Sequence, residues 1–171
     1  MIFLDTNVVS EPMRKVQDPG VVDWLERHDA ELALSTIVIG EIAFGIEKID
    51  AEQRARRLTS DFDALHRRYA DRIFAFTEAA ALNYGMLMAE RKRAGRPMPI
   101  ADAMIAAIAR THGAGLATRN LADFDGSGLE LISPAPHRTA LAPAAQPRPA
   151  PPGRALPSAP FTKGGSILDA D

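Results

Sequence analysis

Short apolar runs alternate with stretches of helical periodicity along residues 1–133, and this alternation restricts the possible folds more than any other feature of the chain. The apolar runs have the length and composition of buried strands, and they occupy 2–4, 33–38, 72–76, 116–118 and 129–132. The longer stretches between them repeat apolar residues every three to four positions, as amphipathic helices do. Strands that alternate with helices favour a parallel sheet with helices on both faces.

The stretches of helical spacing begin near residues 19, 39, 51, 80 and 100. The clearest of them has isoleucine at positions 39, 42, 46 and 49. In the stretch 80–93, the periodicity places Leu82, Met86 and Ala89 on one face. The stretch 100–110 is the most apolar, so we expect it to form the central buried helix.

The composition changes near residue 134. Residues 134–171 hold nine prolines and nine alanines but only a few large apolar side chains. Such a segment cannot fill a core, and proline at this density favours an extended chain. We therefore expect one domain at 1–133, followed by a disordered Pro/Ala-rich tail at 134–171.

Charge and composition exclude several functional classes. Twenty basic against 22 acidic residues give a net charge of −2, so no global field attracts nucleic acid or anionic lipid. The absence of cysteine excludes disulfides and thiolate metal sites and fits a reducing compartment, so we expect a cytoplasmic protein. No apolar run reaches the roughly 18 residues of a membrane span, and no histidine pair has helical zinc spacing. A bound metal would therefore have oxygen ligands.

Four acidic residues fall where strands end or helices begin, and they are Asp5, Glu41, Asp102 and Asp123. In open α/β sheets, ligands bind at this edge. Carboxylates crowded there raise one another's pKa, and Mg²⁺ or Mn²⁺ compensates their charge with a preference for oxygen ligands. Taken singly, the helix dipole explains Asp102, turn formation explains Asp123 and solvation explains Glu41. The combination indicates metal-assisted phosphoryl chemistry.

Four segments in register carry a family resemblance: Ile-Phe-Leu-Asp5-Thr-Asn7-Val-Val-Ser-Glu-Pro, Glu41-Ile-Ala-Phe-Gly45, Ile100-Ala-Asp102-Ala-Met-Ile-Ala-Ala and Ala117-Thr-Arg-Asn-Leu-Ala-Asp123-Phe. Together they resemble the PIN-domain ribonucleases of the VapC type, and most closely the FitB-like branch. The resemblance covers residues 1–133 and implies an α/β/α sandwich around a parallel sheet of about five short strands. It also implies a Mg²⁺- or Mn²⁺-dependent endoribonuclease that acts as the toxin of a toxin–antitoxin pair.

The resemblance assigns roles to individual residues. Asp5, Asp102 and Asp123 match acids that hold the metal, and Glu41 matches a further ligand or proton acceptor. Some relatives place the fourth acid at the position of Asn120 instead of Asp123, so this assignment stays open. The residues that would orient the acids are Thr6, Asn7, Thr118 and Asn120.

Six basic residues are candidates for gripping the RNA backbone, or alternatively form a solvated face: Arg14, Lys15, Arg91, Lys92, Arg93 and Arg96. The resemblance also implies a twofold homodimer and an antitoxin encoded next to this chain, which can place an arginine among the carboxylates. Apolar residues that would receive the antitoxin, or else fill the core, are Val8, Val9, Met13, Trp24 and Leu25.

Two other functions remain compatible with the residues. An aspartate after the first strand is also typical of haloacid-dehalogenase-type phosphatases, although their second aspartate is replaced by Asn7. The other alternative is a binding module that no longer cleaves RNA and works only in a repressor complex with a DNA-binding partner.

Overall fold

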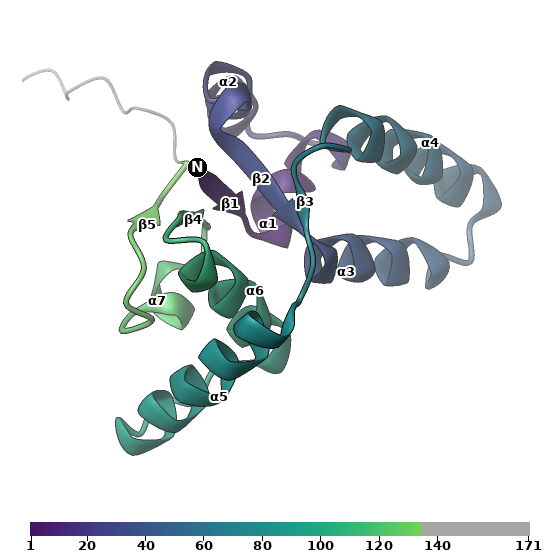
Figure 1. The fold of residues 1–171 in the computed structure, drawn as a ribbon. Coiled ribbons are helices and arrows are strands. Elements are labelled where there is room, and N and C mark those ends of the chain that lie inside the picture. The colour runs from purple at the N-terminus through teal and green to yellow at the C-terminus, as the bar shows by residue number, and fades with distance from the viewer. Residues whose placement is uncertain (135–171) are drawn as a thin grey trace, which may run out of the picture. The chain divides into compact units, whose positions relative to one another are not determined.

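The structure is a computed structural model that describes residues 1–134. Five short strands form one parallel sheet in the order β3-β2-β1-β4-β5, which confirms the predicted fold class (Figure 1). The strands are β1 (Ile2–Leu4), β2 (Leu32–Ser35), β3 (Ile73–Phe74), β4 (Gly115–Ala117) and β5 (Leu131–Ile132). Of the segment 134–171, which is predicted to be a disordered tail, residues 135–171 lie outside the described residues.

Helices and short 3₁₀ turns connect the strands: α1 (Thr6–Val9), η1 (Glu11–Met13), α2 (Pro19–Arg27), η2 (Asp29–Glu31), α3 (Thr36–Glu47), α4 (Glu52–Arg68), α5 (Glu78–Arg93), α6 (Ile100–Thr111) and α7 (Leu121–Phe124). Several begin at a polar residue that satisfies a free backbone amide. The Ser35 hydroxyl accepts the Val38 amide at 3.2 Å, and Thr77 accepts the Ala80 amide at 3.3 Å. The cap at Ser35 ends the second strand earlier than the predicted 33–38.

The strand order reverses direction once, between β1 and β4. The chain first builds the sheet outward from β1 through β2 to β3, and then returns through α5 and α6 to place β4 and β5 on the other side of β1. Because parallel crossovers are right-handed, the two sets of helices lie on opposite faces of the sheet. Ligands in such sheets bind at the carboxyl ends of the strands that flank the reversal.

The core lies around β1, β2 and α6. Residues Ala103 and Ile105–Ala109 of α6 are fully buried, as predicted for the central helix. Phe3 and Leu4 on β1 are also completely buried. Carboxylates placed at the ends of these elements are therefore next to the driest part of the domain.

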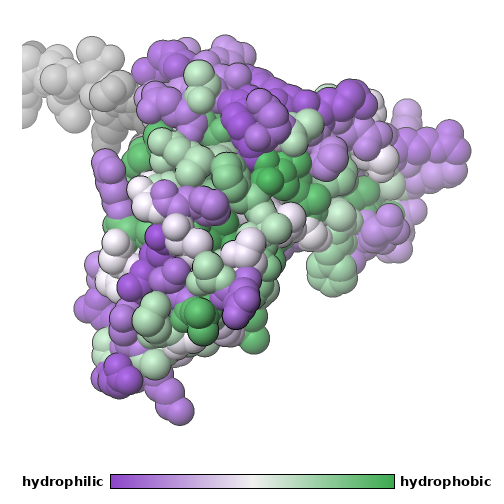
Figure 2. Space-filling model, viewed as in Figure 1, coloured by the Kyte–Doolittle hydropathy of each residue, from purple (hydrophilic) through white to green (hydrophobic). Residues whose placement is uncertain are grey.

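On α5, the face that carries Leu82 and Met86 is not the side that packs into the domain. Leu82 is 67% exposed and Met86 is 53% exposed, whereas Ala80, Leu87 and Arg91 are buried. The helix has two apolar stripes, and α6 covers the one that includes Ala80 and Leu87. In the view of Figure 2, apolar patches interrupt the hydrophilic surface over this part of the domain. Within residues 1–134, no helix is long and apolar enough to span a membrane.

Candidate active site

Asp5 is held rigidly at the carboxyl end of β1. Its backbone amide donates to the Ala117 carbonyl at 2.9 Å, which continues the pairing with β4. Its side chain is only 5% exposed, and the Oδ2 atom accepts the Thr118 hydroxyl at 2.7 Å and the Asn7 amide at 2.6 Å. Burial raises the pKa of Asp5, and the hydrogen bond from Thr118 opposes this rise. Two of the predicted orienting residues thus contact the first predicted acid directly.

Glu41 comes from the second turn of α3, which follows the neighbouring strand β2. The Thr6 hydroxyl donates to Glu41 Oε2 at 2.5 Å. The side chain is half-buried, so solvation alone does not account for its environment. Thr6 follows Asp5 directly, and its hydrogen bond places the second predicted acid beside the first.

Asp102 lies in the first turn of α6 and is half-buried. Its pKa rises from 3.8 to about 6, first because burial removes water and then because Asp5, Glu41 and Asp123 repel its charge. A helix N-terminus would lower the pKa of an isolated carboxyl. Burial and the neighbouring acids therefore act on the pKa of Asp102 in the direction opposite to the helix dipole.

Asp123 lies on the short helix α7, and its charge contributes to the raised pKa of Asp102. The side-chain amide of Asn120 donates to Asp123 Oδ2. The backbone amide of Asn120 donates to the Thr118 hydroxyl at 2.9 Å. The structure therefore places Asn120 as a hydrogen-bonding neighbour of Asp123 and of the Asp5 network.

None of the ion pairs within residues 1–134 involves any of these four acids. Their charge is uncompensated, and oxygen is their only donor atom, a combination that fits a hard divalent cation such as Mg²⁺. Across the same residues, no three acidic or histidine side chains stand close enough together to hold one ion as they are. To share one ion, the carboxylates would have to lie closer together than they do here.

The six predicted RNA contacts have different environments. Arg14 and Lys15 are exposed and line a groove beside Thr6, and Lys92 and Arg93 are exposed at the end of α5. Arg96 pairs with the Asp125 carboxylate.

The structure does not support Arg91 as an RNA contact. Its side chain is only 5% exposed and donates to the backbone carbonyls of Asp123, at 3.2 Å, and Asp125. Arg91 differs from the other basic residues of the predicted cluster because its side of the last turn of α5 faces α7. Arg91 therefore anchors the segment that carries Asp123.

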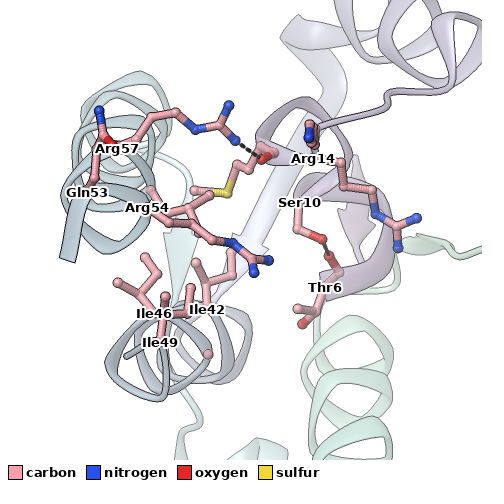
Figure 3. A pocket seen from close by; sticks show the side chains of 13 residues that line it. Thr6, Ser10, Arg14, Ile42, Ile46, Ile49, Gln53, Arg54 and Arg57 are labelled. Carbon is pink, nitrogen blue, oxygen red and sulfur yellow. Dashed lines mark hydrogen bonds between the residues drawn. The ribbon is translucent and has the colours of Figure 1, made fainter. Parts of the chain in front are cut away.

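A groove with a volume of about 1030 Å³ runs between α3 and α4 and reaches α1 (Figure 3). Its floor is apolar, with Ile42 and Ile46 on α3 and Ile49 just beyond the end of that helix, and α4 contributes the guanidinium groups of Arg54 and Arg57. Sequence reasoning missed these two arginines because the polar stretch 51–70 contains many charged residues and nothing distinguished them.

The residues expected to receive the antitoxin fill the core instead. Val8, Val9, Trp24 and Leu25 are all at most 8% exposed, because α1 and α2 pack them against the rest of the domain. Of that set, only Met13 lines the groove. Val8, Val9, Trp24 and Leu25 thus serve packing, and α3 supplies Ile42 and Ile46 to the apolar surface of the groove.

Comparisons with known proteins agree with this fold. Residues 2–125 match the PIN domain family. The plasmid stability protein StbB of Pseudomonas syringae is 38% identical over 136 residues, which cover 78% of this chain and 98% of that protein. The VapC ribonuclease Y4jK of Sinorhizobium fredii is 35% identical, with 78% of this chain and 97% of that protein covered. Toxin FitB of Neisseria gonorrhoeae is 32% identical over 78% of this chain and 98% of its own length.

Solved structures of related proteins have the same fold. The crystal structure of FitAcB from Neisseria gonorrhoeae has a TM-score of 0.74 at 32% identity and covers 78% of this chain and 98% of that one. VapBC2 from Rickettsia felis, bound to a DNA fragment from its promoter, has a TM-score of 0.67 at 26% identity, with 77% and 98% covered. The sequence match, the sheet order and the shared fold lead to one conclusion: this chain belongs to the PIN-domain family, in the group of the VapC and FitB proteins.

Proposed function

We propose that this protein is the toxin of a toxin–antitoxin pair and that it acts in the cytoplasm as a Mg²⁺- or Mn²⁺-dependent endoribonuclease. The observation that carries the proposal is the set of uncompensated carboxylates at the reversal point of the sheet, where burial and then the repulsion among the acids raise the pKa of Asp102 to about 6. Relatives named as VapC ribonucleases support the reaction class. In this proposal Asp5, Asp102 and Asp123 hold the ion.

A bound divalent ion supplies charge neutralisation at the scissile phosphate and activates a water molecule. The chain's own residues fix the acids: Thr118 and Asn7 orient Asp5, and Thr6 orients Glu41. Because Glu41 Oε2 accepts the Thr6 hydroxyl, Oε1 is the atom that takes the proton of the attacking water. The water oxygen bonds to phosphorus, the bond to the 3′ oxygen breaks, and that oxygen takes a proton from solvent. The products carry 5′-phosphate and 3′-hydroxyl ends.

Cleavage of a structured RNA tests the proposed reaction. Wild-type protein with Mg²⁺ or Mn²⁺ should cut the RNA, and EDTA should stop the reaction. Asp5→Ala and Asp102→Ala should each lower the rate by at least about a hundredfold, since each removes a group that acts on the reacting atoms. Asp63→Ala, at an exposed position on α4, is the matched control and should cleave like wild type.

Thermal unfolding separates a metal site from a general effect of ions. Mn²⁺ should raise the melting temperature of wild type and of the Asp63→Ala control, and much less that of Asp5→Ala and Asp102→Ala. Equal stabilisation of all four proteins would contradict the assignment of the acids. Ion binding without cleavage of any RNA would instead support the alternative of a binding module that works only in a repressor complex.

We further propose that the groove between α3 and α4 receives a segment of the antitoxin. The solved relatives include toxin–antitoxin complexes, and the groove combines an apolar floor with an end at Thr6, which contacts Glu41. An apolar segment with a cation at its tip would bury the isoleucines and reach the carboxylates.

Two glycines on α3 give a matched test of this groove. Gly45 lines the groove and Gly40 does not, and a Cβ atom added at either position meets open space. Gly45→Gln should block capture of the co-expressed neighbouring gene product, whereas Gly40→Gln should not, as measured by co-purification. Equal capture by the two variants would place the antitoxin elsewhere.

A further inference from the structure

Among the carboxylates of residues 1–134, that of Glu11 is the most buried. The proposed reaction does not use it. Its side chain is 2% exposed. Glu11 Oε1 accepts the Asp18 backbone amide at 2.8 Å. Glu11 Oε2 accepts Arg119 Nη1 at 2.7 Å and lies 3.2 Å from Arg14 Nε. A single carboxylate on η1 therefore fixes two arginines that are 105 positions apart in the chain.

Arg119 is also tied to the acid cluster through its own backbone. Its amide donates to Asn7 Oδ1 at 3.2 Å, and Asn7 donates through Nδ2 to Asp5. Its chain neighbour Thr118 donates to the same Asp5 oxygen. The backbone of Arg119 is thus held beside the residues that orient Asp5, while Glu11 fixes its guanidinium, and Arg14 lines the groove together with Thr6.

The number of cations exceeds what burial of Glu11 requires. One backbone amide and one guanidinium suffice to compensate a buried carboxylate, but Glu11 has two guanidiniums. The side chain of Arg119 is 39% exposed and that of Arg14 is 51% exposed, so both keep donor groups open to solvent. Each guanidinium carries five N–H donors, and Glu11 engages only one of them in each case. Glu11, Arg14 and Arg119 together carry a net charge of +1.

A cation is needed at this position because the four acids repel the backbone of any RNA that approaches them. We propose that Arg119 and Arg14, oriented by the buried Glu11, form a clamp that binds a backbone phosphate of the RNA beside the acid cluster. The clamp rests on the proposed function, since it binds the substrate of that reaction. Guanidinium suits the task because its planar fork pairs bidentately with phosphate oxygens. Glu11 is a positioning residue, and the two arginines contact the substrate.

Binding of a fluorescein-labelled single-stranded RNA in EDTA, followed by anisotropy over a range of salt concentrations, tests the clamp in the full-length protein. Arg119→Ala and Arg14→Ala should each weaken binding about five- to tenfold and flatten the salt dependence of log K by about 0.7. Arg119→Lys should recover part of the affinity. Arg27→Ala on α2, where Arg27 pairs with the exposed Asp23, is the matched control and should bind like wild type.

Glu11→Gln best distinguishes an oriented clamp from simple attraction by charge, because it makes the region around Arg14 and Arg119 more positive by one charge. If charge alone attracted the RNA, this variant would bind more tightly. The clamp requires it to bind more weakly, because the guanidiniums lose the anion that orients them. In Mg²⁺ or Mn²⁺, Arg119→Ala should raise KM by the same factor as it weakens binding and leave kcat within about twofold.

The outcomes separate the clamp from the proposed function. If wild type cleaves RNA but Arg119→Ala and Arg14→Ala match Arg27→Ala in affinity and salt dependence, the clamp is wrong and the function stands. If wild type neither binds nor cleaves RNA, the proposed function is wrong and the clamp with it. Should Glu11→Gln fail to fold, the arginine variants still decide between these outcomes.

Discussion

At the scale of single residues, Asp102 is the position where local and global effects oppose each other most clearly. A carboxyl in the first turn of a helix is favoured by the dipole of that helix. In the folded protein, burial and three other acids reverse this preference and raise the pKa of Asp102 to about 6. Such a shift is typical of residues that bind ligands or react.

The raised pKa predicts how stability depends on pH. The folded-state pKa of Asp102, about 6, exceeds its ordinary value of 3.8, so the folded state holds a proton that the unfolded state has released. Stability should therefore fall as pH rises from about 4 to 6 and stay reduced above that. In EDTA, Asp102→Asn should melt close to wild type at pH 4 and at a higher temperature at pH 7.

The control for this prediction is Asp63→Asn, which changes an exposed carboxyl on α4. Its melting temperature should differ from wild type by the same small amount at every pH. A difference between Asp102→Asn and wild type that does not grow with pH would contradict the assigned repulsion.

At the scale of elements, the short helix α7 depends on a side chain from α5. Four residues cannot form a stable helix on their own. The guanidinium of Arg91 binds the carbonyls of Asp123 and Asp125, and these contacts hold the end of α7 against the domain. The position of the Asp123 carboxylate is therefore determined by a residue 32 positions earlier in the chain.

Replacement of Arg91 tests this dependence. Arg91→Ala should lower the free energy of unfolding by about 3 kcal/mol, because it removes a buried side chain and the donors that it supplies to the carbonyls of Asp123 and Asp125. It should also reduce cleavage, since Asp123 loses its support. Lys92→Ala, one position along and exposed, should change stability by less than about 0.5 kcal/mol. Urea unfolding of both variants measures the difference, and equal stability would show that α7 does not need Arg91.

At the scale of the whole molecule, the exposed apolar stripe on α5 is where we expect the predicted homodimer to form. Leu82 and Met86 are one helical turn apart and mostly exposed, which is costly for a protein that stays monomeric. A twofold axis across α5 would bring the same stripe from both copies together. The double variant Leu82→Glu/Met86→Glu should sediment as a monomer.

The matched control for the dimer is Ala81→Glu, which adds a charge to an exposed position on another side of α5. It should sediment like wild type. The double variant should also keep its melting temperature at low protein concentration, because α6 covers the opposite stripe. A wild type that sediments as a monomer would rule out this use of the stripe.

The sequence alone determined the order of the elements and the candidate acids. Strand and helix periodicities are local properties, so five strands and the central helix α6 were found in their places. Asp5 and Asp102 stood out for the same reason: each interrupts or directly follows an apolar run. The parallel sheet then brought the carboxyl ends of β1 and β4 together, as the topology of such folds requires.

Only the tertiary structure decided which side of each element is covered. Periodicity shows that α5 is amphipathic, but α6 selects Ala80 and Leu87 over Leu82 and Met86. Likewise, Val8 and Trp24 had the composition of either a groove or a core, and packing placed them in the core. The partners of Arg91, Glu11 and Arg119 come from distant segments, and such contacts leave no periodic signal because their spacing is set by the fold and not by any one element.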